Sequence, residues 1–284
     1  MTKTITNTTS GILTLVATPI GNLADITARA IEALAKSSVV CCEDTRRSGL
    51  LLQHLGISGK KYVVVNEHTE HDACEEIVAT LFAGSNVALI TDAGTPGISD
   101  PGERIVRAVI DAGLTVTSTP GPSALVMALV LSGLSTSRFV FEGFIPRNGI
   151  ERTQRLTDIG NETRTVVLYE APHRLGRTLS DLQAVCGPLR RVVLARELTK
   201  IHEELWRGNL HDAAQHAQTT EPRGEYVVML EGAKPPAPPT DEELNDALRD
   251  ELNKGASRKD AASRVSAKYG VAKRRVYELT LQLK

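Results

Sequence analysis

The sequence predicts an α/β protein with two α/β domains of similar size and a small helical module at its C-terminus. Short apolar runs bounded by Gly and Pro alternate with longer amphipathic stretches, which is the pattern of strands covered by helices. A length of 284 residues with 41% hydrophobic residues suits about two domains. The segment AKPPAPPT (233–240) contains four prolines in eight residues and is typical of an extended linker.

The first α/β domain is expected over residues 11–120, after a flexible N-terminal tail over 1–10. The alternating pattern along the whole chain indicates largely parallel sheets, and open sheets of this kind bind ligands beyond the carboxyl ends of their strands. The loops that leave the strands are therefore the first places to look for chemistry. The predicted strands are 12–17, 38–42, 61–65, 87–91 and 115–118.

The second α/β domain is expected over residues 121–232. It begins in the turn TPGPS (119–123), after which Ser123 is the predicted N-cap of a helix of small and apolar residues. Helix-like segments again separate the strands. These are predicted at 138–142, 165–169, 191–195 and 226–230.

The C-terminal module over 241–284 is basic. Helices are predicted over 241–252, 257–269 and 273–283, with Gly255 and Gly270 near the breaks. Residues 254–284 hold nine Lys or Arg against two acidic residues, so this segment carries +7 and the rest of the chain −8. Such a module predicts a polyanionic partner, because Lys and Arg contacts release counterions from phosphate. A solvated helix face is the alternative.

Several classes are excluded by the absence of their motifs. The chain has no G-x-G-x-x-G, no P-loop, no H-E-x-x-H and no G-x-S-x-G, which argues against dehydrogenases, NTPases, zinc proteases and serine hydrolases. No segment has the apolar character of a signal peptide or membrane span, so a cytoplasmic protein is expected. No metal is expected, and buried reduced thiols are predicted at Cys41, Cys42, Cys74 and Cys186.

Three loops are unusual: ATPIGN (17–22), TDAGTPGISDPGE (91–103) and TPGPSA (119–124). Their glycines and prolines let the backbone approach a ligand closely, which suits a small zwitterionic molecule with an adenosine portion. The same residues also form turns. Asp100 is the predicted N-cap of the following helix with Pro101 at its first position, and Asp25 or Thr27 caps the helix after the first loop.

Taken together, TPIGN, CEDTR, DAGTPGISDPG, TPGPSA, FEGFIPR, YEAPHR and ARELTK resemble the ribosomal RNA small-subunit methyltransferase I family of the tetrapyrrole methylase superfamily. The resemblance covers about residues 11–232 and, more weakly, the C-terminal helices. It implies a homodimer that holds S-adenosylmethionine between the two domains. It also implies methylation of the ribose 2′-hydroxyl of a decoding-centre cytidine in 16S rRNA, either as free RNA or in the small ribosomal subunit.

The resemblance also implies which residues hold the cofactor. The chain departs from the wider superfamily, which usually carries G-D-P where this sequence has Gly94-Thr95-Pro96. That difference argues against a porphyrinoid substrate. The implied cofactor residues are Pro19, Gly94, Thr95, Ile98, Ser99, Ser123, Ala124 and Glu170.

A ribose hydroxyl is a poor nucleophile at neutral pH, so its attack calls for a positioned base or a stabilising cation. The sequence leaves the choice open among Asp44, Arg46 and Asp100, with Glu43, Glu170 and His173 as further candidates. Arg46 and Arg47 suit phosphate contact or a surface ion pair. Arg152 and Arg155 follow FEGFIP in a polar stretch that fits an RNA-facing loop or a solvated helix face equally well. Glu225 could meet the cofactor cleft at a strand start or be an ion-pair partner in the cleft wall. The predicted RNA contacts are Arg46, Arg147, Lys273, Arg274 and Arg275.

Two other functions remain open. One is a methyltransferase of the same fold that acts on a small molecule or on a protein side chain. The other is a non-catalytic RNA-binding assembly factor, which would bind RNA without binding the cofactor.

Overall fold

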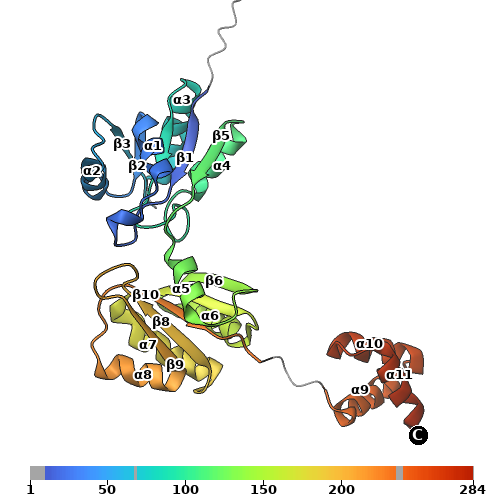
Figure 1. Ribbon diagram of the computed structural model, residues 1–284. Helices are drawn as coiled ribbons and strands as arrows, with labels where there is room; N and C mark the ends of the chain where they lie inside the picture. The colour runs from blue at the N-terminus through green and yellow to red at the C-terminus, as the bar shows by residue number, and fades with distance from the viewer. Residues whose placement is uncertain (1–9, 67–68, 235–238, 284) are drawn as a thin grey trace, which may run out of the picture. The chain divides into compact units, whose positions relative to one another are not determined.

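The computed structural model describes residues 10–66, 69–234 and 239–283, which form two compact units, one ending at Ala233 and the other beginning at Lys234 (Figure 1). The expected tail over 1–10 and the middle of the expected linker over 233–240 lie largely outside the described residues. The first unit contains two five-stranded sheets.

The first sheet is parallel throughout, as predicted, and has the order β3-β2-β4-β1-β5. Each predicted strand of this half is confirmed to within two residues at either end. The central strands are buried on both faces, which explains their unbroken apolar runs. The strands are β1 (Ile12–Val16), β2 (Val39–Cys42), β3 (Lys61–Val64), β4 (Val87–Leu89) and β5 (Thr115–Thr119).

Helices cover both faces of this sheet. Leucine, isoleucine and valine from α3 (Glu70–Phe82) and α4 (Glu103–Asp111) pack on one face. On the other face lie α1 (Ala28–Lys36) and α2 (Thr45–His54). The short 3-10 helix η1 (Leu23–Asp25) precedes α1, whose N-cap is Thr27, one of the two predicted candidates.

The prediction that Asp100 caps the next helix is wrong. Helix α4 begins only at Glu103, after Gly102 at φ 138°. Its first amides are satisfied from α3 instead, because Oε1 of Glu70 accepts from the N–H of Gly102 (2.9 Å) and of Arg104 (3.1 Å). A carboxylate from another helix thus replaces the local cap. Asp100 is left free of that role.

The second sheet differs from the expected largely parallel pattern. Its order is β6-β7-β10-β8-β9, and only β6 and β7 are parallel. The other three pairs are antiparallel. The four predicted strands are confirmed. The edge strand β9 was not predicted, because it has only two apolar residues, Leu205 and Trp206, and a glycine at its second-last position. The strands are β6 (Phe139–Phe144), β7 (Thr165–Glu170), β8 (Arg191–Arg196), β9 (Glu204–Asn209) and β10 (Tyr226–Leu230).

Helix α5 (Ala124–Ser132) follows the first sheet and packs on one face of the second. The other face is covered by α6 (Gly149–Asn161), α7 (Pro172–Cys186) and α8 (Leu210–Thr219). Ser123 is the N-cap residue of α5, as predicted, but its hydroxyl makes no capping bond. The N–H of Leu125 donates to Oη of Tyr169 at 3.2 Å, so a strand of the second sheet supplies the partner.

The second unit contains α9 (Asp241–Asn253), α10 (Arg258–Tyr269) and α11 (Lys273–Gln282), which confirms the three predicted helices. A capping box between Thr240 and Glu243 starts α9, and Gly270 ends α10 in the left-handed conformation. The three helices share a small core of Leu, Val and Ala. Within the described ranges, no helix has the length and apolar character that crossing a membrane requires.

Candidate functional site

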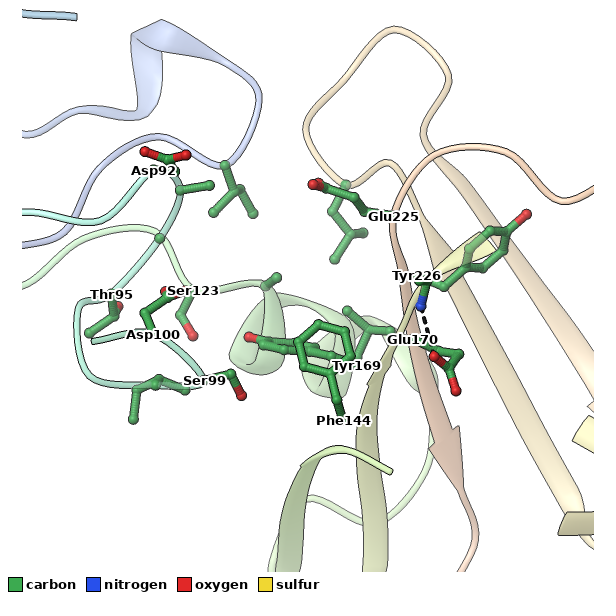
Figure 2. Close-up of a pocket in the computed structure, with 18 of the residues that line it drawn as sticks. Asp92, Thr95, Ser99, Asp100, Ser123, Phe144, Tyr169, Glu170, Glu225 and Tyr226 are labelled. Carbon is green, nitrogen blue, oxygen red and sulfur yellow. Dashed lines mark hydrogen bonds between the residues drawn. The ribbon is translucent and has the colours of Figure 1, made fainter. Parts of the chain in front are cut away.

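A cavity of about 380 Å³ lies in the first unit, where the loops after β4 and β5 face the ends of β7, β8 and β10 (Figure 2). Its volume falls in the range of small-molecule sites. Figure 2 shows Asp92, Thr95, Ser99, Asp100 and Ser123 on one side. Opposite them it shows Phe144, Tyr169, Glu170, Glu225 and Tyr226.

Backbone hydrogen bonds hold the three glycine- and proline-rich loops together at this edge. Thr18 and Gly94 exchange two of them, at 2.9 and 3.1 Å, and Oγ1 of Thr95 donates to the carbonyl of Pro122 at 3.1 Å. Gly94 has φ 88° and Ser99 has φ 61°. A non-glycine residue with such a φ is strained, and this kind of strain gathers at functional sites.

One wall of the cavity is acidic. Oε1 of Glu43 accepts from Oγ1 of Thr91 (2.6 Å) and from the N–H of Asp92 (3.3 Å). Asp92 pairs with Arg47 at 3.2 Å. Burial, with the nearby charges of Glu43 and Asp92, raises the pKa of Asp100 to about 6. The wall therefore favours a cationic ligand group and holds a carboxylate that titrates close to neutrality.

The opposite wall carries a lysine that the sequence analysis did not single out. Nζ of Lys200 lies 2.8 Å from Glu197 and 2.9 Å from Glu225. Burial alone lowers the pKa of Lys200, but the hydrogen bonds to these two carboxylates raise it overall. Its loop is strained at Glu197 (φ 50°) and Thr199 (φ 67°). The sequence feature that could have identified Lys200 is its place in ARELTK, directly after a predicted strand.

Aromatic rings form the apolar part of the cavity. Tyr169 packs edge to face against Phe144, with ring centroids 5.7 Å apart, and against Phe141 at 4.9 Å. Phe144 and Tyr169 line the cavity together with Ile20 and Leu198. A flat ring of a ligand would find a fixed surface here.

Most of the residues implied to hold a cofactor line this one cavity. They come from the loops after β4 and β5 and from the end of β7: Gly94, Thr95, Ile98, Ser99, Ser123, Ala124 and Glu170. Pro19 does not line it. This proline lies in a neighbouring groove of about 260 Å³ that shares Arg47 and Asp92 with the cavity.

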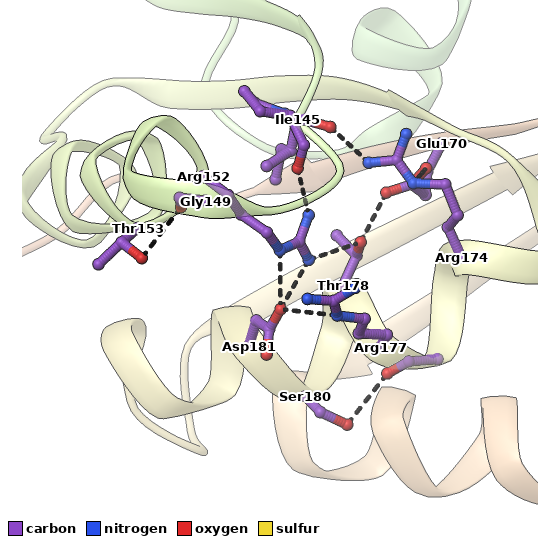
Figure 3. Close-up of polar contacts among 12 residues, drawn as sticks. Ile145, Gly149, Arg152, Thr153, Glu170, Arg174, Arg177, Thr178, Ser180 and Asp181 are labelled. Atoms are coloured by element: carbon purple, nitrogen blue, oxygen red, sulfur yellow. Dashed lines mark hydrogen bonds and ion pairs between the residues drawn. The ribbon is translucent and has the colours of Figure 1, made fainter.

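The carboxylate of Glu170 is occupied by protein groups (Figure 3). It accepts from Oγ1 of Thr178 at 2.6 Å and from the N–H of Ala171 at 2.9 Å, and it pairs with Arg174 at 3.2 Å. The residue is 2% exposed. The Glu170 carboxylate therefore holds the first turns of α7 and is not free for a ligand.

Arg152 is a buried structural residue rather than part of an RNA-facing loop or a solvated helix face, and Figure 3 shows its polar contacts. It is 4% exposed on α6, pairs with Asp181 at 2.6 Å and donates to the carbonyl of Pro146 at 2.9 Å. A buried guanidinium needs such partners, since an unpaired charge in the core is costly. Arg155 pairs with Glu142 at 2.6 Å.

The structure separates the three catalytic candidates. Asp100 lines the cavity, whereas Asp44 and Arg46 do not. Asp44 is the N-cap of α2, and it pairs with Arg46 at 2.8 Å. The side-chain hydrogen bond from Arg46, with that from its N–H, lowers the pKa of Asp44 to about 2. Among the further candidates, Glu43 lines the cavity and His173 is exposed on α7.

The candidate RNA contacts are at the surface. Arg147 is exposed after β6, and the side chain of Arg46 is 87% exposed. In the first turn of α11, Lys273 donates to Ser263 at 3.0 Å, Arg274 pairs with Glu278 at 3.4 Å and Arg275 pairs with Asp241 at 2.7 Å. The two exposed ion pairs are weak and can exchange for phosphate.

No group of three or more His, Cys, Asp and Glu side chains in the described part of the chain could hold a metal ion. The four cysteines carry free thiols. Cys41 and Cys42 are buried, as predicted, whereas Cys74 and Cys186 are half-buried.

The chain matches a family model and many curated proteins. The model of the Tetrapyrrole (Corrin/Porphyrin) Methylases matches residues 13–214. Ribosomal RNA small subunit methyltransferase I of Synechocystis sp. is 46% identical over 275 residues, which cover 96% of this chain and 98% of that protein. The protein of the same name from Haemophilus influenzae is 43% identical, with 96% and 97% covered.

Solved structures share the fold. The methyltransferase CobJ matches with a TM-score of 0.60 at 20% identity, covering 79% of this chain and 95% of that one. Uroporphyrin-III C-methyl transferase from Thermus thermophilus, complexed with S-adenyl homocysteine, matches with a TM-score of 0.54 at 15% identity, covering 78% and 97%. At this identity the likeness concerns the fold alone.

The match of residues 13–214 to the family model, on a fold of two sheets around one cavity, identifies a methyltransferase of the tetrapyrrole methylase class. The chain belongs to the tetrapyrrole methylase family and, within it, to the ribosomal RNA small subunit methyltransferase I family. The fold class, the family resemblance and the enzyme class predicted from the sequence are confirmed.

Proposed function

We propose that this protein transfers a methyl group from S-adenosylmethionine to the ribose 2′-hydroxyl of a decoding-centre cytidine in 16S rRNA, acting on the small ribosomal subunit in the cytoplasm. The observation that carries the proposal is the 46% identity over 96% of the chain to a relative named for rRNA methylation. The Thr95 position, where the wider superfamily usually has an aspartate, argues against a porphyrinoid acceptor.

The cavity fits the proposed cofactor. Its volume of about 380 Å³ suits one nucleoside linked to an amino acid. Gly94 lets a ligand approach the backbone closely because glycine has no side chain, and its φ of 88° is one that glycine adopts readily. The Phe144 and Tyr169 rings suit the purine, and the acidic wall suits the positive sulfonium and ammonium groups. When bound, the cofactor supplies an electrophilic methyl group.

The chain's own residues must then align the hydroxyl and remove its proton. We assign proton removal to Asp100, because it lines the cavity and its pKa of about 6 leaves it ionised at neutral pH. Lys200, on the opposite wall, is a fixed positive charge that would stabilise the negative charge developing on the attacking oxygen. Asp44 and Arg46 lie outside the cavity, and we retain Arg46 only as an RNA contact.

The direct test is transfer of labelled methyl from S-adenosylmethionine to undermethylated small ribosomal subunits, followed by nuclease digestion and mass spectrometry of the nucleosides. The expected product is 2′-O-methylcytidine. Label in a ribosomal protein or in a small molecule would favour those acceptors instead. RNA binding without cofactor binding would indicate a non-catalytic assembly factor.

We propose that the C-terminal module, from 241 to 284 after the 233–240 linker, binds RNA through phosphate contacts. Deleting 241–284 should weaken subunit binding at least about tenfold and flatten its dependence on salt, because fewer counterions are released. Cofactor affinity should stay within about twofold. Filter binding across a salt series measures the first effect and calorimetry the second. An unchanged salt slope would contradict the assignment.

We propose a homodimer that uses the outer face of α5. This helix is apolar on all sides: Ala128 and Leu129 are buried against the second sheet, but Val126 is 51% and Val130 is 60% exposed. A helix that is apolar all round is normally covered. Val130→Asp should shift the protein from dimer to monomer in sedimentation velocity at micromolar concentration, while Leu189→Asp, at a site 81% exposed before β8, should not. A monomeric wild-type protein would contradict the proposal.

A further inference from the structure

The groove that holds Pro19 lies between η1 and α2, beside the cavity. We call it the η1–α2 groove and define it by Pro19, Leu23, Arg47, Leu50, Leu51 and Asp92. Its volume is about 260 Å³. Arg47 and Asp92, paired at 3.2 Å, belong to both spaces, so the ion pair forms their common wall.

The lining of this groove is unusual for a protein surface. Leu50 is 68% exposed and Leu23 is 46% exposed. The Arg47 side chain beside them is 69% exposed. Neighbouring exposed leucines rimmed by a cation are typical of a contact surface rather than of a solvated helix face.

The cavity leaves little room for an acceptor once a cofactor is bound. About 380 Å³ is filled by one cofactor molecule, so the acceptor has to reach the methyl group from outside. The η1–α2 groove is the neighbouring space that shares a wall with the cavity. A nucleotide seated in the groove would place its ribose over the Arg47–Asp92 pair, next to the acidic wall with Asp100.

From this arrangement we infer that the η1–α2 groove binds the nucleobase of the acceptor nucleotide, splayed out of the RNA chain. The inference rests on the proposed function and names the acceptor subsite for it. Single-stranded bases are recognised by packing their faces on apolar and guanidinium surfaces. Leu23, Leu50 and Pro19 supply the apolar surface, and Arg47 supplies the guanidinium and a contact for the adjoining phosphate.

Substitutions at Leu50 test the inference, because this side chain lines the groove and not the cavity. Leu50→Glu should weaken binding of undermethylated small subunits about tenfold, by repelling phosphate and disrupting base packing. Leu50→Phe should bind within about twofold of wild type, since an aromatic ring keeps the packing surface. Leu189→Glu adds the same charge on an exposed leucine before β8 and should bind like wild type. Cofactor affinity, measured by calorimetry, should not change in any of them.

Subunit affinity of Leu50→Glu within twofold of wild type would overturn the inference, and so would an equal loss in Leu189→Glu. A protein with p-benzoylphenylalanine at position 50 adds a direct test of the occupant. Irradiation with the subunit in the presence of S-adenosylhomocysteine should cross-link it to 16S rRNA. A cross-link to a ribosomal protein, or none, would overturn the nucleobase assignment. Methyl transfer by the wild-type enzyme is scored in parallel, so failure of the proposed function itself is seen separately.

Discussion

Replacing Asp100 with Asn is expected to lower kcat for methyl transfer at pH 7.5 by at least about a hundredfold, which is the usual contribution of a positioned base. Asn keeps the size of the side chain but cannot accept the proton. The affinity for the cofactor and for the ribosomal subunit should change much less than kcat. The measurement is single-turnover transfer with both substrates saturating.

The pH profile distinguishes a base from a structural residue. Since burial, with the charges of Glu43 and Asp92, raises the pKa of Asp100 to about 6, the carboxyl is protonated and inactive below that pH. Wild-type kcat should therefore rise as the pH increases through about 6 and then level off. The residual activity of Asp100→Asn should lack this rise, and a rise of equal size in the variant would contradict the role.

Asp100→Asn should lower kcat but raise the stability of the fold at alkaline pH. A carboxyl whose pKa is raised by folding stabilises the protein below the unfolded value and loses that contribution as the pH rises through the folded value. Asp100→Asn should therefore raise the unfolding temperature at pH 8 relative to wild type, although it lowers kcat. Asp44→Asn is the matched control: asparagine still caps α2, Asp44 lies outside the cavity, and activity should be retained.

The first half of the fold was predictable because its strands are buried on both faces and have continuous apolar runs. In the second half, the sequence predicts strand positions but not their direction, because Tyr226–Leu230 pairs antiparallel with both neighbours through contacts remote in sequence. The edge strand Glu204–Asn209 has too few buried residues to give a pattern. Similarly, the local cap predicted at Asp100 gave way to Glu70, 30 residues earlier in the chain.

At the site, too, the sequence predicts some features, whereas others depend on contacts remote in sequence. The loop motifs identify which backbone segments meet, and seven of the eight implied cofactor residues line one cavity. They do not show where each side chain points. The Glu170 carboxylate is bonded to Thr178 and Arg174. Arg152, for which an RNA-facing loop and a solvated helix face were equally open, is instead held inside by Asp181. Lys200 stands in the ARELTK motif, but the motif does not show that a strained loop places this residue at the cavity.

The other large effect is expected at Gly94. This residue has φ 88°, and a Cβ built on it lies 3.3 Å from Cγ2 of Ile20, at the lining of the cavity. Gly94→Asp would add a side chain and a negative charge where the cofactor backbone contact is proposed. The dissociation constant for S-adenosylmethionine, measured by calorimetry, should rise at least about a hundredfold, which corresponds to roughly 2.7 kcal/mol.

Gly97→Asp separates that effect from simple backbone strain. Gly97 lies in the same loop with φ 81°, but its built Cβ has no atom within 4 Å and the residue does not line the cavity. Both substitutions force a non-glycine residue into the left-handed region, at a cost of about 1–2 kcal/mol to the fold. Only Gly94→Asp should also lose the cofactor. Equal cofactor affinity in the two folded variants would mean that the cofactor is not held at the loop after β4.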